Sequence, residues 1–286
     1  MKVRIGAVIV AAGLASAGCS KKPEPAVAEV RPAASGVVTV VARDYGYDMP
    51  SVMPAGVTTI QVVNHGEQLH HMQIVKVDSG HTSDDLIKAL GARSNPAWAL
   101  PLGGPNAIEP GQSVTTIQTL PVGHYVVLCF IPGADGAPHF MKGMRGEFDV
   151  VASAVTATEE PKADATFSLA DYSFGHPSIG AGPRIVRVEN TAQQVHELVL
   201  VKLEAGKSAG DMLNWFVGGM KTPAPGHFVS GVVGLAPGQH TFFSYTFEAG
   251  NYGLLCFVDD AKDGKPHVMH GMVSQFTVPA DVAVKN

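Results

Sequence analysis

The stretch GHYVVLCFIPGADGAPHFMKGM at residues 123–144 returns as GNYGLLCFVDDAKDGKPHVMHGM at residues 250–272. Both copies begin with Gly-x-Tyr-x3-Cys and end with Pro-His-x3-Gly-Met. Matching residues lie 127 or 128 positions apart. A repeat of this length is a whole domain, since the units of solenoid proteins recur every roughly 20 to 50 residues. The sequence therefore predicts two tandem domains of one fold.

The repeat extends well upstream of these two stretches. Three motifs recur in register: Asp44-Tyr45-x-Tyr47 with Asp171-Tyr172-x-Phe174, Asn64-x5-His70 with Asn190-x5-His196, and Pro110-Gly111-Gln112 with Pro237-Gly238-Gln239. The match thus covers nearly all of each copy and is not confined to the two stretches quoted above.

Composition and local pattern favour a β protein. The chain has 32 Gly and 20 Pro in 286 residues, which suits many turns. Runs rich in Val, Ile and Thr predict strands at 37–41, 58–63, 70–77, 114–120, 125–130 and 145–150 of the first copy, and at 273–278 of the second. Residues 79–90 predict a short helix with Thr82 or Ser83 as its N-cap. The fold class expected is all-β, with two tandem Greek-key β-sandwich domains that each carry a short helical insertion.

The strand at 70–77 assigns faces to two neighbouring histidines. Strand alternation places His70 on the face of Met72 and Ile74, and His71 on the opposite face. In the second copy Glu197 replaces His71. We therefore expect His70 to point inward and His71 to be solvated or at a rim.

Each copy supplies one His, one Cys, a second His and one Met, in that order. The two sets are His70, Cys129, His139 and Met144, then His196, Cys256, His267 and Met272. Two imidazoles, a thiolate and a thioether form the ligand set of a blue-copper electron-transfer site. A single His, Met or Cys on an apolar strand usually belongs to the core, but eight in two matching quartets favour a metal. Zinc remains an alternative, although Met is a poor zinc ligand.

These motifs resemble the cupredoxin family. The resemblance implies one copper ion per domain, each held by one of the two quartets above. It also implies that Cys and the second His lie on one loop and that Met forms a long axial bond to the metal. It also implies one-electron transfer with a redox partner. One departure is the spacing: nine residues separate Cys129 from His139 and ten separate Cys256 from His267, where electron-carrier cupredoxins usually have two to four.

Other functions were weighed against the same residues. Multicopper oxidases need His-x-His pairs, and the sequence has none. Copper nitrite reductases place His directly before Cys, where this chain has Leu128 and Leu255. We therefore expect no enzyme. The alternatives to electron transfer are a copper storage or delivery protein, with a copper donor or acceptor as partner, and a non-metal envelope scaffold module.

The N-terminus predicts export and lipid anchoring. Residues 1–18 have a basic start, a short apolar run and small residues before Cys19, which is typical of a bacterial lipoprotein signal. Cys19 would then carry the lipid and hold the protein at the periplasmic side of a membrane, the outer one if the host has two.

The net charge of −5 and the absence of a basic patch disfavour nucleic acid as a partner. The predicted parts are a signal peptide at 1–18, a tether at 19–35, domain 1 at 36–152, a linker at 153–164 and domain 2 at 165–280, and each domain is expected to fold independently.

Overall fold

The computed structural model describes residues 36–92, 96–153 and 159–280. The predicted signal peptide, the lipidation site Cys19 and the tether lie outside these residues, as does part of the linker. Within the described ranges, no helix has the length and apolar character needed to cross a membrane.

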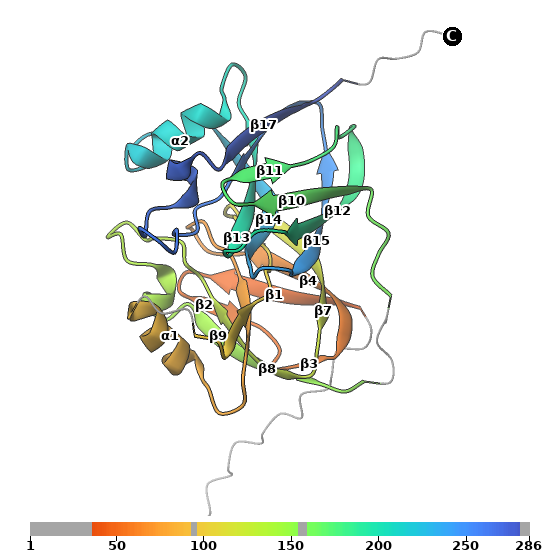
Figure 1. Cartoon of the computed structure of the whole chain (residues 1–286), viewed down its shortest axis with the longest axis vertical. Helices are drawn as coiled ribbons and strands as arrows, with labels where there is room; N and C mark the ends of the chain where they lie inside the picture. The colour runs from red at the N-terminus through yellow and green to blue at the C-terminus, as the bar shows by residue number, and fades with distance from the viewer. Residues whose placement is uncertain (1–35, 93–95, 154–158, 281–286) are drawn as a thin grey trace, which may run out of the picture. The chain divides into compact units, whose positions relative to one another are not determined.

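The predicted all-β class is confirmed, since strands dominate and the two α-helices are short (Figure 1). The first repeat contains β1 (Val37–Arg43), β2 (Gly46–Asp48), β3 (Val52–Pro54), β4 (Gly56–Asn64), β5 (Gln73–Val77), α1 (Ser83–Gly91), β6 (Ala99–Pro101), β7 (Ser113–Leu120), β8 (Gly123–Leu128), the 3₁₀ helix η1 (His139–Lys142) and β9 (Arg145–Val151). The second repeat contains β10 (Ala165–Ala170), β11 (Ser173–Gly175), β12 (Gly182–Asn190), β13 (His196–Leu203), α2 (Ala209–Val217), β14 (Gly226–Leu235), β15 (His240–Phe247), β16 (Gly250–Leu255), the 3₁₀ helix η2 (His267–His270) and β17 (Val273–Val278).

Most predicted strands are present, but one begins later than the pattern indicated. The first-repeat strand predicted at 70–77 starts at Gln73, because His70 pairs with Ile108 in an isolated bridge instead. In the second repeat, β13 starts at His196 itself.

Each repeat is a sandwich of two sheets, and one sheet is continuous through both repeats. Its order is β11-β10-β12-β15-β7-β4-β1-β2, and the repeats meet where β15 pairs antiparallel with β7. A five-stranded sheet of β3-β9-β8-β5-β6 completes the first sandwich, and a four-stranded sheet of β14-β13-β16-β17 completes the second. Alternating buried and solvent-facing residues along β1 and β7 follow the period of two that a half-buried strand requires.

The two helical insertions begin with the same cap. Thr82 caps α1 and Ser208 caps α2, each through a capping box in which an Asp three residues later bonds back to the cap. This local sequence signal, and not packing alone, sets where both helices start.

Each sandwich has its own apolar core, and the predicted Cys and Met ligands belong to it. One cluster holds Cys129 and Met144 with Phe148 and Tyr125. The other holds Cys256 and Met272 with Tyr252 and Phe276. The stacked Tyr–Phe pair recurs in both, with ring centroids 4.9 Å apart in the first repeat and 5.4 Å in the second. The candidate ligands therefore lie in rigid, closely packed surroundings.

The segment 101–106 of the first repeat lies along the edge of β14 in the second. Gly103 donates to the carbonyl of Gly234 at 3.0 Å, and Val233 donates to the carbonyl of Gly104 at 3.0 Å. Gly104 has φ of +128°, and a side chain there would meet the carbonyl of Met72 at 2.0 Å, so only glycine fits. No motif in the sequence indicates this pairing. The predicted domain boundaries and independent folding stay predictions.

Candidate metal centres

Three predicted ligands of the first repeat converge at the end of the sandwich core. The donor atoms of His70, Cys129 and His139 all lie within 4.8 Å of one another, and all three residues are fully buried. The two Nδ1 atoms are 3.2 Å apart, and Cys129 Sγ lies 3.6 Å from Nδ1 of His139.

The second repeat builds the same group. His196, Cys256 and His267 place their donor atoms within 4.8 Å of one another, again with no exposure. Cys256 Sγ lies 3.4 Å from Nδ1 of His267 and 3.8 Å from Nδ1 of His196. Both groups thus use the same ring nitrogen, so the repetition extends to atomic detail.

A buried asparagine holds the loop that carries the first histidine. Asn64 donates to the carbonyls of Gln68 at 2.7 Å and Ile108 at 2.8 Å, and accepts from the backbone N–H of Gly66 at 2.8 Å. Its repeat partner Asn190 makes the equivalent three contacts. One side chain thereby satisfies three backbone groups and fixes the approach to the ligand.

The long Cys-to-His loops return the second histidine to the cysteine. In the first repeat, Pro132 and Pro138 form a bridge, so the extra residues make a small hairpin. His139 then donates its backbone N–H to the carbonyl of Ile131 at 2.9 Å, and Phe140 donates to the carbonyl of Cys129 at 2.9 Å. The second repeat closes in the same way through a bridge between Asp259 and Pro266. The unusual spacing therefore leaves both ligand groups assembled.

The predicted methionines are tied to the same loops. Met144 is fully buried, accepts from the backbone N–H of Cys129 at 3.2 Å and donates to the carbonyl of His139 at 3.0 Å. Met272 makes the matching contacts at 3.3 and 3.1 Å. A left-handed glycine precedes each one, Gly143 with φ of +106° and Gly271 with φ of +92°, which allows the tight turn after the 3₁₀ helix.

Carboxylates orient the first histidine of each centre. His70 Nε2 lies 2.8 Å from Oδ1 of Asp44, and His196 Nε2 lies 2.9 Å from Oδ1 of Asp171. A carboxylate accepts only from a protonated nitrogen, so Nε2 carries the proton and Nδ1 keeps its lone pair toward the cysteine. We did not identify these acids as functional from the sequence, although both stand in a motif that recurs in register.

The second histidine of each centre has a different outer partner. His139 Nε2 lies 3.2 Å from Oε1 of Gln68, which again leaves Nδ1 unprotonated. His267 Nε2 is buried without a hydrogen-bond partner among the described residues, and Asp260 approaches it only to 3.7 Å. The second centre is therefore held less tightly at this nitrogen than the first.

Burial keeps these groups neutral. It lowers the pKa of His139 and of His267 to about 4, with the neighbouring histidine adding to the effect. Burial also raises the pKa of the Cys129 thiol to about 12 and that of Cys256 higher still. At neutral pH each centre therefore offers two neutral imidazoles and a thiol that loses its proton only when a cation replaces it.

This arrangement fits copper. Two unprotonated Nδ1 atoms 3.2 Å apart repel each other, and a cation between them and the sulfur would remove that repulsion. The donors are imidazole and thiolate, and the buried Met144 and Met272 are bound through their backbones to the same loops, a set of residues that suits copper and that zinc uses poorly. There is one such group in each repeat.

The expectation that His71 is solvated or at a rim was wrong. His71 is 4% exposed and accepts from the backbone N–H of Phe130 at 2.7 Å. Glu197, at the same position of the second repeat, is 6% exposed and accepts from the backbone N–H of Phe257 at 2.8 Å. Because β5 begins only at Gln73, His71 precedes the strand, and strand alternation does not apply to it.

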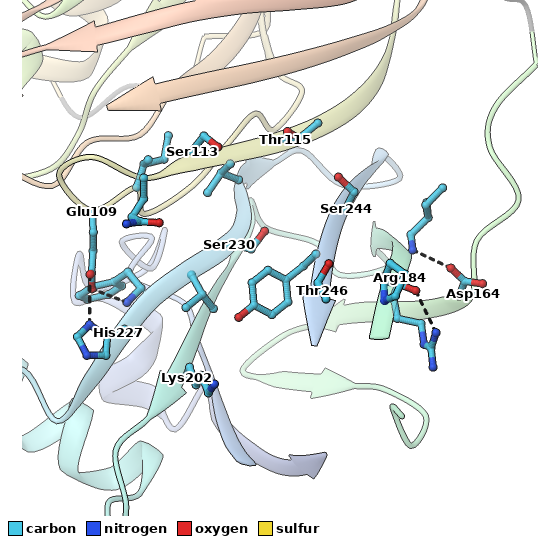
Figure 2. A pocket seen from close by; sticks show the side chains of 18 residues that line it. Glu109, Ser113, Thr115, Asp164, Arg184, Lys202, His227, Ser230, Ser244 and Thr246 are labelled. Carbon is cyan, nitrogen blue, oxygen red and sulfur yellow. Dashed lines mark hydrogen bonds and ion pairs between the residues drawn. The ribbon is translucent and has the colours of Figure 1, made fainter. Parts of the chain in front are cut away.

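Two other features are not part of the predicted ligand sets. Asp260, Asp263 and His270 form a third group of potential ligands, largely exposed. A groove of about 960 Å³ between strands of both repeats contains Glu109, which accepts from His227 Nδ1 at 3.3 Å (Figure 2). None of the eight predicted ligands lines this groove.

Comparison with known proteins gives only structural neighbours. No family model and no curated protein matches the sequence. The chain is similar to the dithionite-reduced auracyanin of Roseiflexus castenholzii, with 26% identity over 42% of this chain and 99% of that one and a TM-score of 0.31. It is also similar to auracyanin B, with 20% identity over 43% and 93% and a TM-score of 0.31. The blue copper oxidase of Nitrosomonas europaea matches 85% of both chains at 13% identity with a TM-score of 0.25.

Proposed function

We propose that this chain is an exported copper protein that transfers single electrons through two type-1-like sites, one in each repeat. The observation that carries the proposal is the convergence of two imidazole Nδ1 atoms and one sulfur in a buried group that occurs twice. Copper, when bound, supplies the one-electron chemistry. The residues of the chain supply the rigid surroundings in which it occurs.

Rigidity is the contribution of the fold to such a reaction. The asparagine that pins each ligand loop, the carboxylate on each first histidine and the closed Cys-to-His hairpin all restrict ligand movement. Ligands that keep their positions in both oxidation states have little to reorganise when an electron arrives. The same restraint would disfavour a site that must open to release its ion.

Electron transfer is favoured over catalysis by the residues next to the ligands. Leu128 and Leu255 precede the two cysteines, and the sequence has no His-x-His pair. The partner is then a redox protein of the cell envelope. The lipid on Cys19 would keep the chain on the periplasmic side of a membrane, at the outer membrane in a host with two.

Copper storage or delivery is the second candidate. The observation in its favour is a pair of exposed methionines at matching positions, Met141 with 63% and Met269 with 48% exposure. Each lies on the 3₁₀ helix that begins with the second ligand histidine, where a thioether can meet an incoming Cu(I) ion. A non-metal scaffold is the third candidate and predicts no metal binding at all.

The test is to add Cu(II) to the soluble form, residues 20–286, and record visible and EPR spectra. Electron transfer predicts an intense sulfur-to-copper band, of which Cys129→Ser removes the first repeat's share and Cys256→Ser the second's. Met220→Leu is the control, because Met220 is 41% exposed and stands outside both quartets. Reversible sub-second reduction separates electron transfer from storage, which predicts instead the release of copper to a chelator. A colourless protein with both thiols still titratable would end the proposal.

A further inference from the structure

A buried chain of hydrogen bonds connects the two candidate copper centres. Asn106, from the first-repeat segment that pairs with β14, is 1% exposed. Its Oδ1 lies 3.3 Å from Nδ1 of His71, and its Nδ2 donates to Oε2 of Glu197 at 3.0 Å. His71 and Glu197 in turn bind the backbone N–H of the residue that follows each ligand cysteine. The path thus begins beside Cys129 and ends beside Cys256.

The hydrogen bonds along this path determine which side-chain atoms carry a proton. His71 Nε2 accepts from Phe130, so the ring proton is on Nδ1 and donates to Oδ1 of Asn106. The amide of Asn106 then donates to Glu197, whose other oxygen accepts from Phe257. Each donor on the path meets an acceptor, so the bridge is complete without water.

We propose that His71, Asn106 and Glu197 form the route by which an electron passes from one copper centre to the other. The inference rests on the proposed function. In this step the centre of one repeat is oxidised by one electron and the centre of the other is reduced by it. No proton moves and no bond is made or broken.

Three observations support a route and not merely an interface contact. The three side chains are almost completely buried, so water does not interrupt the path. His71 and Glu197 each directly follow a ligand histidine in the sequence and also contact the residue after a ligand cysteine, so each end joins its centre at two points. Glu197 makes a third contact, because its backbone N–H donates to Cys256 Sγ at 3.4 Å.

The central residue is the one to change, because Asn106 contacts neither ligand set itself. Asn106→Leu removes both bridge bonds at similar volume. Gln73→Leu is the matched control: Gln73 is also buried, and its Nε2 donates across the same interface to the carbonyl of Gly234 at 2.9 Å. It does not belong to the path. Glu197→Gln is a second test variant, because an amide there presents a donor either to Asn106 or to Phe257, where an acceptor is required.

The measurement is the rate of electron exchange in the fully copper-loaded protein after a flash that delivers less than one electron per molecule. All proteins carry Met144→Leu, which we expect to raise the potential of the first centre and so give the exchange a direction. Freeze-quenched EPR follows which centre holds the electron. Asn106→Leu should slow the exchange by about tenfold, within the range that mutations along a coupling network reach. Gln73→Leu should leave it unchanged.

Two further readouts separate a route from a structural role. The potentials of both centres should be the same in Asn106→Leu as in its parent, because the ligands are untouched. In the metal-free protein, the amide hydrogens of Phe130 and Phe257 should exchange faster in Asn106→Leu and in Glu197→Gln but not in Gln73→Leu. Equal exchange rates in a protein with two coloured centres, or equal slowing by the Gln73 control, would overturn the route and leave the proposed function standing. If Asn106→Leu does not fold, Glu197→Gln gives the same decision. A colourless protein would end both proposals.

Discussion

Replacement of Asp44 by alanine should weaken copper binding at the first centre while leaving all four predicted ligands in place. Asp44 accepts from His70 at 2.8 Å and from the backbone N–H groups of Glu67 and Gln68 at 3.1 and 3.3 Å. Without it, the His70 ring loses the contact that selects its tautomer and its orientation. Loss of an outer-shell partner of this kind typically costs 10- to 100-fold in metal affinity, or about 1.4 to 2.7 kcal/mol.

The effect on stability should be smaller than the number of lost bonds suggests. The Asp44 side chain is 30% exposed, so water replaces part of what the protein loses. Each net hydrogen bond contributes about 0.5–1.5 kcal/mol, and solvent reduces that further. We therefore expect about 1 kcal/mol of destabilisation in the metal-free protein, with the greater loss appearing only when copper is bound.

A competitive copper titration in a Cys256→Ser background reads the first centre alone. Asp48→Ala is the matched control, since Asp48 is 65% exposed and pairs with Arg43 at the surface. Asp44→Asn should fall between the two, because its amide oxygen can still accept from His70. If Asp44→Ala lowers affinity no more than Asp48→Ala does, the carboxylate does not orient the ligand and this reasoning is wrong.

Three further outcomes are expected. Cys19→Ser should move the protein from the membrane fraction to the soluble fraction on fractionation of cells, and an unchanged distribution would refute the lipid anchor. Fragments 36–152 and 165–280 should each melt cooperatively, whereas a loss of dispersed amide signals in both would refute independent folding. Acidification should remove a stabilising contribution of Glu160, which accepts from Thr119 of the first repeat and His240 of the second. Partial burial of Glu160 opposes its ionisation, but the hydrogen bonds from His240 and Thr119 outweigh this effect and lower the pKa of Glu160 below 4.5. The stabilising contribution is therefore full above pH 4.5 and is lost as the pH falls through the lowered pKa. The melting temperatures of wild type and Glu160→Gln should accordingly converge at low pH.

Residues that act through local chemistry could be predicted from the sequence. The sequence predicts Thr82 or Ser83 as the cap of the first helix because a cap needs only its own next turn, and Thr82 is the cap in the structure. The donor atoms of His70, Cys129 and His139 were expected to meet because their spacing recurs in both copies, and the structure brings them together. Their role as copper ligands stays a prediction.

Contacts between the repeats could not be predicted in this way. Asn106 has nothing in its neighbourhood that distinguishes it from an ordinary loop residue, because its partners lie 35 residues away in one direction and 91 in the other. The pairing of β15 with β7 likewise depends on how two complete sandwiches meet. A pattern with a period of two reports which face of a strand is buried, but not which strand lies beside it.

The difference between His71 and Glu197, which follow the first histidine of each centre, has a physical reason in the bridge. A single asparagine has one accepting end and one donating end. If histidine followed the first ligand in both repeats, each ring would accept from a backbone N–H and present a protonated nitrogen to Asn106, and one of these would meet the amide NH₂. If glutamate stood at both positions, one carboxylate would meet the amide oxygen. One Asn can connect the two copies only when a donor such as His71 lies on one side and an acceptor such as Glu197 on the other. The divergence of this position, beside two matching quartets, is therefore what a direct connection between the centres requires.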